Sequence, residues 1–304
     1  MPIIVIDEIF DPIGNSHKHK QLPTVHWQYV GMERKYAVQV DRLFPEGETA
    51  MRNNITMHCT GTKDGKALWQ ITKDNFYIDN IKPEDHITLL AIACVATYYP
   101  FEFMATKDGQ IDSVINPDKL KKRFAEAKPT LLQYYEGDVA IEYIDEIETF
   151  LLDLERLKDI VTKDIWLSLF FAPIIGEYDH ETRAKEVNIK FPFFGFEESI
   201  LFKGIAIKGV TIKNRYSVKV EGELILPAII EDIIITGGKI EIIYDINNTT
   251  SYIENIKCNI SIITEQGEHK MIMNGYEIIK RPIVEKIKEV KPKPEPVGWM
   301  AFFK

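Results

Sequence analysis

Two parts of the chain alternate apolar and polar residues in the manner of antiparallel strands. In residues 23–81 the pattern predicts strands at His26–Val30, Tyr36–Val40, Asn54–Cys59 and Ala67–Ile71. The last two are separated by Asp64-Gly65, a pair that tolerates the positive φ angles of a tight hairpin turn.

The second alternating part, residues 184–281, is rich in Ile and Val. Glycines and an Asn pair interrupt it at intervals typical of a strand plus a turn, which predicts about seven antiparallel strands. The interrupting residues are Gly204, Gly209, Gly222, Gly237-Gly238, Asn247-Asn248 and Gly267.

Between these parts, residues 83–173 mostly have the spacing of helices. A first helix is expected to begin near Pro83 and to end before Pro100, because proline suits the first turn but cannot continue a helix. A short hairpin follows, with strands at Phe101–Ala105 and Gln110–Val114.

Capping residues and prolines predict the remaining helix boundaries. Asn116 is a good N-cap and Pro117 a good first residue, so we expect a helix that Pro129 interrupts. Thr162 is expected to cap a helix at Asp164–Phe171. A long amphipathic helix is predicted after Gly137, with an apolar stripe at Ile144, Ile147, Leu151, Leu154, Leu157 and Val161.

The order of strands, helices and strands predicts an α+β fold rather than alternating βαβ units. We expect one α+β domain at residues 23–283, which is β-rich at 23–81, mainly helical at 83–173 and β-rich at 184–281. An N-terminal arm precedes it at residues 1–22. A charged, Pro-rich spacer with an aromatic end follows it at residues 284–304.

One segment of this pattern resembles a known group of proteins. Tyr99–Val114, followed by a helical block that ends in Phe170-Phe171-Ala172-Pro173 and by a long run of strands, resembles uncharacterised bacterial proteins thought to share the half-barrel fold of periplasmic lipoprotein carriers. The resemblance covers Pro23 to about Ile279. It implies a curved antiparallel sheet partly closed by helices on its concave side, a shape that the carriers use for acyl chains. It carries over no functional residue.

Charge and composition narrow the classes of partner. The 304 residues are 45% hydrophobic, enough for a large core, and 46 acidic against 37 basic side chains give a net charge of -9. This charge repels phosphate backbones, so we expect no nucleic acid partner. No apolar run approaches the roughly 20 residues of a membrane span, and the N-terminus lacks the pattern of a secretory signal. Three widely spaced cysteines fit free thiols, so a cytoplasmic location is predicted.

The sequence contains no recognisable catalytic motif. It has neither the Gly-x-Ser-x-Gly nucleophile pattern nor a Gly-rich phosphate loop, so we expect a non-enzymatic protein without a cofactor. His17, His19 and His26 are interpreted as solvated loop residues rather than metal ligands. A solvated helix face is the interpretation of the acidic cluster formed by Asp138, Glu142, Asp145, Glu146 and Glu148.

Two aromatic groups are candidates for binding. Phe191, Phe193, Phe194 and Phe196 either pack into the main core or form the wall of an apolar ligand cavity. At the C-terminal end, leaving Trp299, Met300, Phe302 and Phe303 in water costs roughly 1.5–3 kcal/mol per side chain relative to burial. This tail is expected to dock either on the same chain or in a groove of a partner protein.

These features lead to two functional hypotheses. The first is a protein–protein interaction or assembly component of a bacterial cytoplasmic complex, anchored by its tail. The alternative is a carrier or sensor of an apolar, lipid-like small molecule. A continuous apolar cavity inside the sheet favours the carrier, whereas a packed body with an exposed apolar patch favours the assembly component.

Overall fold

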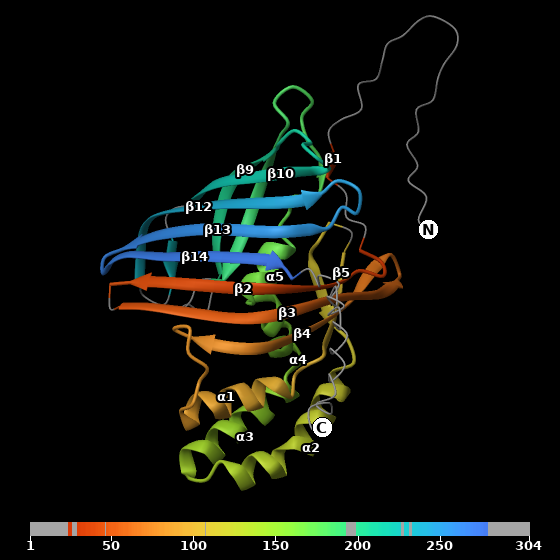
Figure 1. The fold of residues 1–304 in the computed structure, drawn as a ribbon. Helices are drawn as coiled ribbons and strands as arrows, with labels where there is room; N and C mark the ends of the chain where they lie inside the picture. The colour runs from red at the N-terminus through yellow and green to blue at the C-terminus, as the bar shows by residue number, and fades with distance from the viewer. Residues whose placement is uncertain are drawn as a thin grey trace, which may run out of the picture.

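The computed structural model in Figure 1 describes residues 24–25, 29–45, 47–106, 108–192, 199–225, 228–230 and 233–278. The strands are β1 (Thr24–Val25), β2 (Glu33–Phe44), β3 (Gly47–Lys63), β4 (Lys66–Ile78), β5 (Phe101–Ala105), β6 (Ile111–Val114), β7 (Gly176–Glu177), β8 (Ala184–Pro192), β9 (Ser199–Lys208), β10 (Arg215–Leu224), β11 (Ala228–Ile230), β12 (Ile233–Asn247), β13 (Ile253–Thr264) and β14 (Gly267–Glu277). The helices are α1 (His86–Ala96), α2 (Pro117–Tyr134), α3 (Asp138–Leu152), α4 (Leu154–Thr162) and α5 (Ile165–Phe170). The predicted arm at residues 1–22 and the predicted spacer and tail at residues 284–304 lie outside the described residues.

Twelve strands form one antiparallel sheet in the order β6-β5-β4-β3-β2-β14-β13-β12-β10-β9-β8, with β11 paired to β12. The two β-rich parts of the chain meet where β2 pairs with β14, from Tyr36 opposite Glu277 to Leu43 opposite Lys270. In Figure 1 the sheet curves around α5, and β6 and β8 are its two ends. The predicted α+β class and curved antiparallel sheet are therefore confirmed. β1 and β7 form a separate two-stranded pair.

The sheet has a buried concave face and an exposed convex face. Along β9, Ile200, Phe202 and Ala206 are buried, whereas the alternate residues Leu201 and Lys203 are exposed. This period of two follows from the pleat, which turns successive side chains to opposite faces.

Local turn chemistry accounts for the first hairpins. The predicted strands at Tyr36–Val40, Asn54–Cys59 and Ala67–Ile71 lie within β2, β3 and β4. Asp64 and Gly65 form the turn between β3 and β4 with φ angles of 51° and 75°.

The predicted first strand, His26–Val30, is wrong in its described part. Tyr29 and Val30 lie in a turn before β2, which the backbone N–H of Met32 closes by donating to Tyr29 O at 2.8 Å. Residues 26–28 lie outside the described residues.

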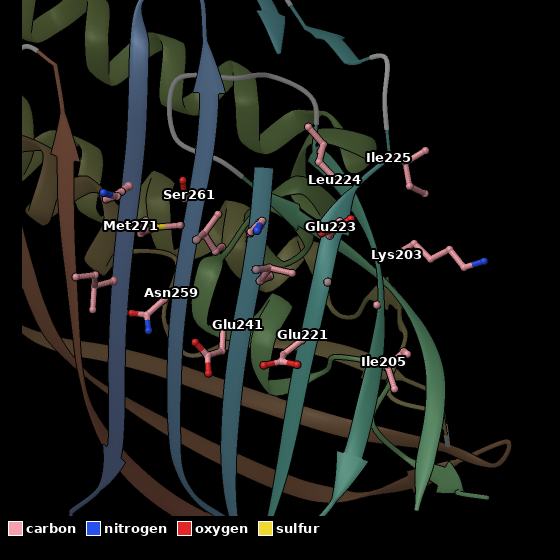
Figure 2. A pocket seen from close by; sticks show the side chains of 17 residues that line it. Lys203, Ile205, Glu221, Glu223, Leu224, Ile225, Glu241, Asn259, Ser261 and Met271 are labelled. Carbon is pink, nitrogen blue, oxygen red and sulfur yellow. The ribbon is translucent and has the colours of Figure 1, made fainter. Parts of the chain in front are cut away.

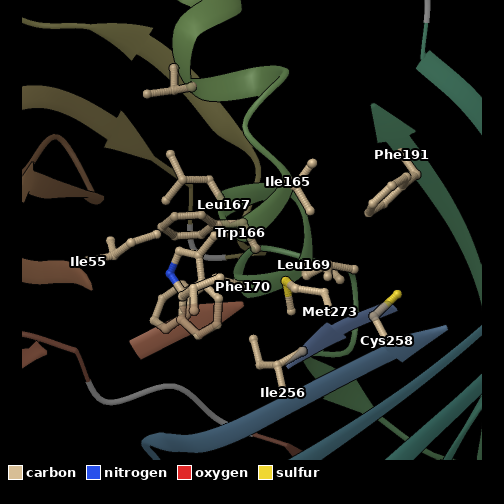
Figure 3. Close-up of a cluster of buried hydrophobic side chains, with 14 of the residues drawn as sticks. Ile55, Ile165, Trp166, Leu167, Leu169, Phe170, Phe191, Ile256, Cys258 and Met273 are labelled. Carbon is tan, nitrogen blue, oxygen red and sulfur yellow. The ribbon is translucent and has the colours of Figure 1, made fainter. Parts of the chain in front are cut away.

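Helix α5 packs against the concave side of the sheet, where Figure 3 shows its side chains among those of Ile55, Ile256 and Met273. Five of its side chains are buried: Ile165, Trp166, Leu167, Leu169 and Phe170. The Trp166 ring lies 4.8 Å from that of Tyr36 on β2, and Tyr244 on β12 donates its hydroxyl to Leu169 O at 2.9 Å. The centre of the core is therefore the contact between α5 and the sheet.

The start of α5 is fixed by Asp164, not by Thr162 as predicted. The Asp164 carboxylate accepts a hydrogen bond from Leu167 N at 3.0 Å and forms an ion pair with Lys73 on β4. Burial alone would lower the pKa of Lys73, but the negative charge of Asp164, with a smaller contribution from Tyr99, outweighs it and raises that pKa. Lys73 stays charged, so the ion pair joins α5 to the sheet.

The predicted long helix after Gly137 is two helices, α3 and α4. Asp153 separates them, because its extended backbone ends α3 and its side chain caps α4 by accepting from Glu155 N and Arg156 N. The stripe residue Leu154, just after this break, is 57% exposed. An apolar stripe shows which face is buried but does not reveal a cap inside it.

Helix α2 also departs from the prediction. It continues through Pro129 to Tyr134, although an internal proline costs about 3 kcal/mol. Leu131, in the turn that follows, is buried in the core, and this burial offsets part of the cost. Asn116 precedes the helix in a left-handed conformation with φ 54° and makes no capping bond; its side chain donates to Glu102 instead.

The C-terminal half contains the predicted seven strands, β8 to β14, but not all of the predicted turns. Gly204, Gly222 and the pair Gly237-Gly238 lie inside β9, β10 and β12. Within the described ranges, no helix is both long and apolar enough to cross a bilayer.

Candidate functional site on the convex face

A broad depression of about 960 Å³ lies on the convex face of the sheet (Figure 2). Strands β9, β10, β12, β13 and β14 line it. Figure 2 shows Glu221, Glu241 and Asn259 on the side of these strands that faces away from the helices. The lining combines exposed residues of the convex face with core residues, among them Ile240, Ile260 and Met271.

Two glycines form part of the floor, where β9 and β10 approach closely. Gly204 lies directly opposite Gly222. A Cβ atom on Gly204 would lie 2.3 Å from Glu221 O and 2.8 Å from Gly222 Cα. Glycine is needed here for space rather than for its backbone angles, which explains why both residues occur inside strands.

Charges of opposite sign alternate across the depression. Lys203 on β9 lies opposite Glu223 on β10, and Glu223 lies opposite Lys239 on β12. Such cross-strand pairs contribute roughly 0.2–1 kcal/mol each. With Glu221, Glu241 and Lys270, the lining has three carboxylates and three ammonium groups and is neutral in sum.

One pair of like charges is compensated from outside the depression. Glu221 and Glu241 lie directly opposite each other on β10 and β12. Lys219 bridges them, with its Nζ 2.6 Å from one Glu221 oxygen and 3.0 Å from one Glu241 oxygen. These hydrogen bonds raise the pKa of Lys219 and hold the two carboxylates beside each other.

Exposed aliphatic side chains surround these charges. Ile205 is 49% exposed, Ile225 44% and Ile272 36%, and all three line the depression. Leu201 and Ile263 on the same face are also exposed. An apolar surface with interspersed charges is the composition of many protein interfaces.

The other candidates for chemistry are metal-ligand clusters and the three thiols. They include no group of three or more His, Cys, Asp and Glu side chains placed to hold a metal ion. Cys59, Cys94 and Cys258 are free thiols, as predicted, and all three are buried. Burial raises the pKa of all three thiols, that of Cys94 to about 11, so they remain protonated and unreactive near neutral pH.

Of the predicted binding residues, the structure describes Phe191 alone. Its side chain is fully buried on β8 and packs in the core near α5 (Figure 3). The other predicted residues lie outside the described residues: Phe193, Phe194, Phe196, Trp299, Met300, Phe302, Phe303, His17, His19 and His26.

The predicted acidic cluster lies on α3. Asp145 and Glu148 both bind Lys128 of α2, with carboxylate oxygens 2.7 and 2.6 Å from its Nζ. These contacts hold the two helices together. Asp138, Glu142 and Glu146 are exposed, in keeping with the predicted solvated face.

Sequence reasoning did not identify the depression, although a signal was present. Leu201, Ile205 and Ile207 occupy the polar phase of the β9 alternation and are exposed. When both the inward-facing and the outward-facing positions of a strand are apolar, the outer face of the sheet is predicted to bind another molecule.

No family model matches the sequence, and no curated protein matches it. A solved structure of lipovitellin, described as showing lipid–protein interactions, is similar with a TM-score of 0.45 and 11% sequence identity over 84% of this chain. The match covers 26% of the lipovitellin chain, so this chain spans about a quarter of that protein's length.

Proposed function

We propose that this chain is a non-enzymatic component of a protein assembly in a bacterial cytoplasm, and that the convex face binds the partner. The observation that supports this most directly is the distribution of apolar side chains. The concave side is packed by the chain's own helix, whereas the convex side exposes Ile205, Ile225 and Ile272.

Beside Trp69, the contact between the sheet and α5 leaves no room for a ligand. The space bordered by Tyr29, Met32 and Trp69 amounts to about 10 Å³. That is room for roughly one water molecule and not for an acyl chain.

The convex depression has the properties of an interface centre. Burying its isoleucines against a partner would contribute roughly 25 cal/mol per Å² of apolar surface. Its alternating charges would fix the orientation of the partner, because a wrong register brings like charges together.

The test is a double substitution, Ile205→Asp with Ile272→Asp, in the full chain purified from its own host. We expect the recovery of partner proteins to fall at least tenfold in quantitative mass spectrometry, because two charges in an apolar contact are costly to desolvate. The matched control is Ile87→Asp on α1, where the isoleucine is 77% exposed and distant in the fold. Equal recovery by the double variant and the control would refute the proposal, provided that circular dichroism shows both folded.

The C-terminal tail is proposed as a second contact with the partner. Deleting residues 299–304 removes Trp299, Met300, Phe302 and Phe303, and we expect it to weaken recovery of the same proteins. If recovery is unchanged, the tail has no part in the assembly.

A carrier of an apolar small molecule is the second candidate function. Its support is the size of the convex depression, since about 960 Å³ falls within the roughly 300–1,000 Å³ of small-molecule pockets. Native mass spectrometry of protein from its own host would show an added mass if this function is correct. An unmodified mass under conditions that retain lipids would contradict it.

A further inference from the structure

Strand β8 is the last strand in the order of the large sheet, so only one of its two edges pairs with another strand of that sheet among the described residues. Among the described residues, its only neighbour within the large sheet is β9. A cleft of about 850 Å³ lies between β8, at Asn188, Ile189 and Lys190, and the chain's own helices α4 and α5. Unpaired strand edges are ready templates for a further strand.

Hydrogen bonds show which residues of β8 face the open side. The carbonyl of Ala184 accepts from Asp179 N, on the side away from β9. Because backbone groups alternate along an antiparallel strand, Glu186, Asn188 and Lys190 also direct their N–H and C=O groups away from β9. Within the described part of the chain, no hydrogen bond reaches these backbone groups.

We infer that β8 pairs with β8 of a second copy of this chain, antiparallel about a twofold axis at Asn188. In this register Asn188 lies opposite the same residue of the second copy, and Glu186 of each copy lies opposite Lys190 of the other. All three positions present outward backbone groups, as the hydrogen-bonded pairs of an antiparallel ladder require. The contact contains six backbone hydrogen bonds and two Glu–Lys pairs. It joins two sheets into one.

The charges of Glu186 and Lys190 favour this register over registers that are centred on other residues of β8. Centring the axis on Glu186 or on Lys190 places like charges directly opposite each other, which is destabilising. Centring it on Val187 or Ile189 pairs Asn188 with a charged residue and leaves the opposite charges apart. The Asn188 register alone brings both opposite charges together. The present contact of Glu186, with Lys203 at 3.9 Å, is long and exposed.

This inference is independent of the proposed function, because it uses the edge of the sheet and not its convex face. Two surfaces of the same chain then have two partners: a second copy at β8 and a different protein on β9 to β14.

Charge reversal tests the register. The full chain is expected to be a dimer by light scattering, with a dissociation constant that rises at least about tenfold in Glu186→Lys or in Lys190→Glu. The double variant Glu186→Lys with Lys190→Glu restores the opposite pairs and is expected to dimerise like the natural chain. Lys257→Glu on β13, also exposed, is the control and should leave the dimer unchanged.

Two further variants test the pairing itself. Asn188→Pro removes an outward N–H without touching the ladder to β9, so we expect a folded monomer. Asn188→Cys is expected to form a covalent dimer with copper phenanthroline as oxidant, because opposite Cα atoms in such a pair lie about 5.5 Å apart. The natural cysteines are buried, and Lys257→Cys serves as the control.

Several outcomes would overturn the inference. A monomer at every concentration would do so, as would a dimer that survives Asn188→Pro or that disappears only when residues 299–304 are deleted. The Ile205→Asp, Ile272→Asp variant separates the two proposals, because it should lose the foreign partner while remaining a dimer.

Discussion

Gly275 shows how one residue position fixes the central packing of the molecule. It lies on β14, where the strand passes the Trp166 side chain of α5. A Cβ atom on Gly275 would lie 2.1 Å from Cζ3 of Trp166 and 2.9 Å from its Cε3. The indole also packs against the rings of Tyr36 and Phe170, at centroid distances of 4.8 and 5.8 Å, so it has little room to move.

We therefore expect Gly275→Ala to lower the free energy of unfolding by about 1–3 kcal/mol, the usual cost of overpacking a core. The control is Gly61→Ala on β3, where a Cβ atom would meet nothing within 4 Å. Urea unfolding of both variants measures the difference. Equal stability of the two would show that Trp166 is free to shift.

At the scale of elements, Glu102 connects β5 to the start of α2. Its carboxylate accepts hydrogen bonds from Asn116 and from Lys119, the latter at 3.3 Å. Burial alone would raise the pKa of Glu102, but these bonds outweigh it and hold the pKa below its ordinary value.

The sign of the pH dependence follows from that shift. The stabilisation is present above the ordinary Glu pKa of about 4.3 and is lost as the pH falls through the lower folded value. We expect Glu102→Gln to be less stable by about 1 kcal/mol at pH 7, with a difference that disappears towards pH 3. Glu126→Gln, whose 66% exposed side chain lies 3.9 Å from Lys122, is the control and should show almost no effect. A pH-independent difference for Glu102→Gln would contradict this account.

The sequence predicts best those elements that are determined by residues close together in the chain. Asp64-Gly65 favours its hairpin turn wherever it occurs, and alternation alone indicates the strands beside it. The spacing of apolar residues reveals neither the break at Asp153, which a cap inside the stripe produces, nor the continuation through Pro129, which is offset by burial of Leu131 in the core. The pairing of β2 with β14 is likewise invisible, because it joins distant segments with no turn between them.

At the scale of the whole molecule, the candidate site was the least predictable feature. The depression combines residues from five strands, and its charge pairs exist only once β9, β10 and β12 are in register. Aromatic residues such as Phe191 attract attention in a sequence, yet burial in the core accounts for that residue completely. The exposed isoleucines of β9 were the better signal.

Hydrogen exchange should reveal the stability of the sheet from centre to edge. We expect the slowest amide exchange in β2 and β14, which are paired on both sides, and faster exchange in β6 and β8 at the ends. The amides of Glu186, Asn188 and Lys190 should exchange rapidly in dilute solution and become protected as the concentration rises. Slow exchange of these three at every concentration would show that another segment of the same chain covers them.

The junction of β2 and β14 also has a consequence for biosynthesis. Beside this junction, the Tyr36 hydroxyl donates to Ile253 O at the start of β13, 217 residues further along the chain and still before β14. At about 5–20 residues per second, a ribosome needs roughly 10 to 40 seconds to produce that partner. Until then the nascent hairpins of β2 to β5 expose the flank of β2, and this is the interval in which a ribosome-associated chaperone would protect the growing polypeptide from aggregation.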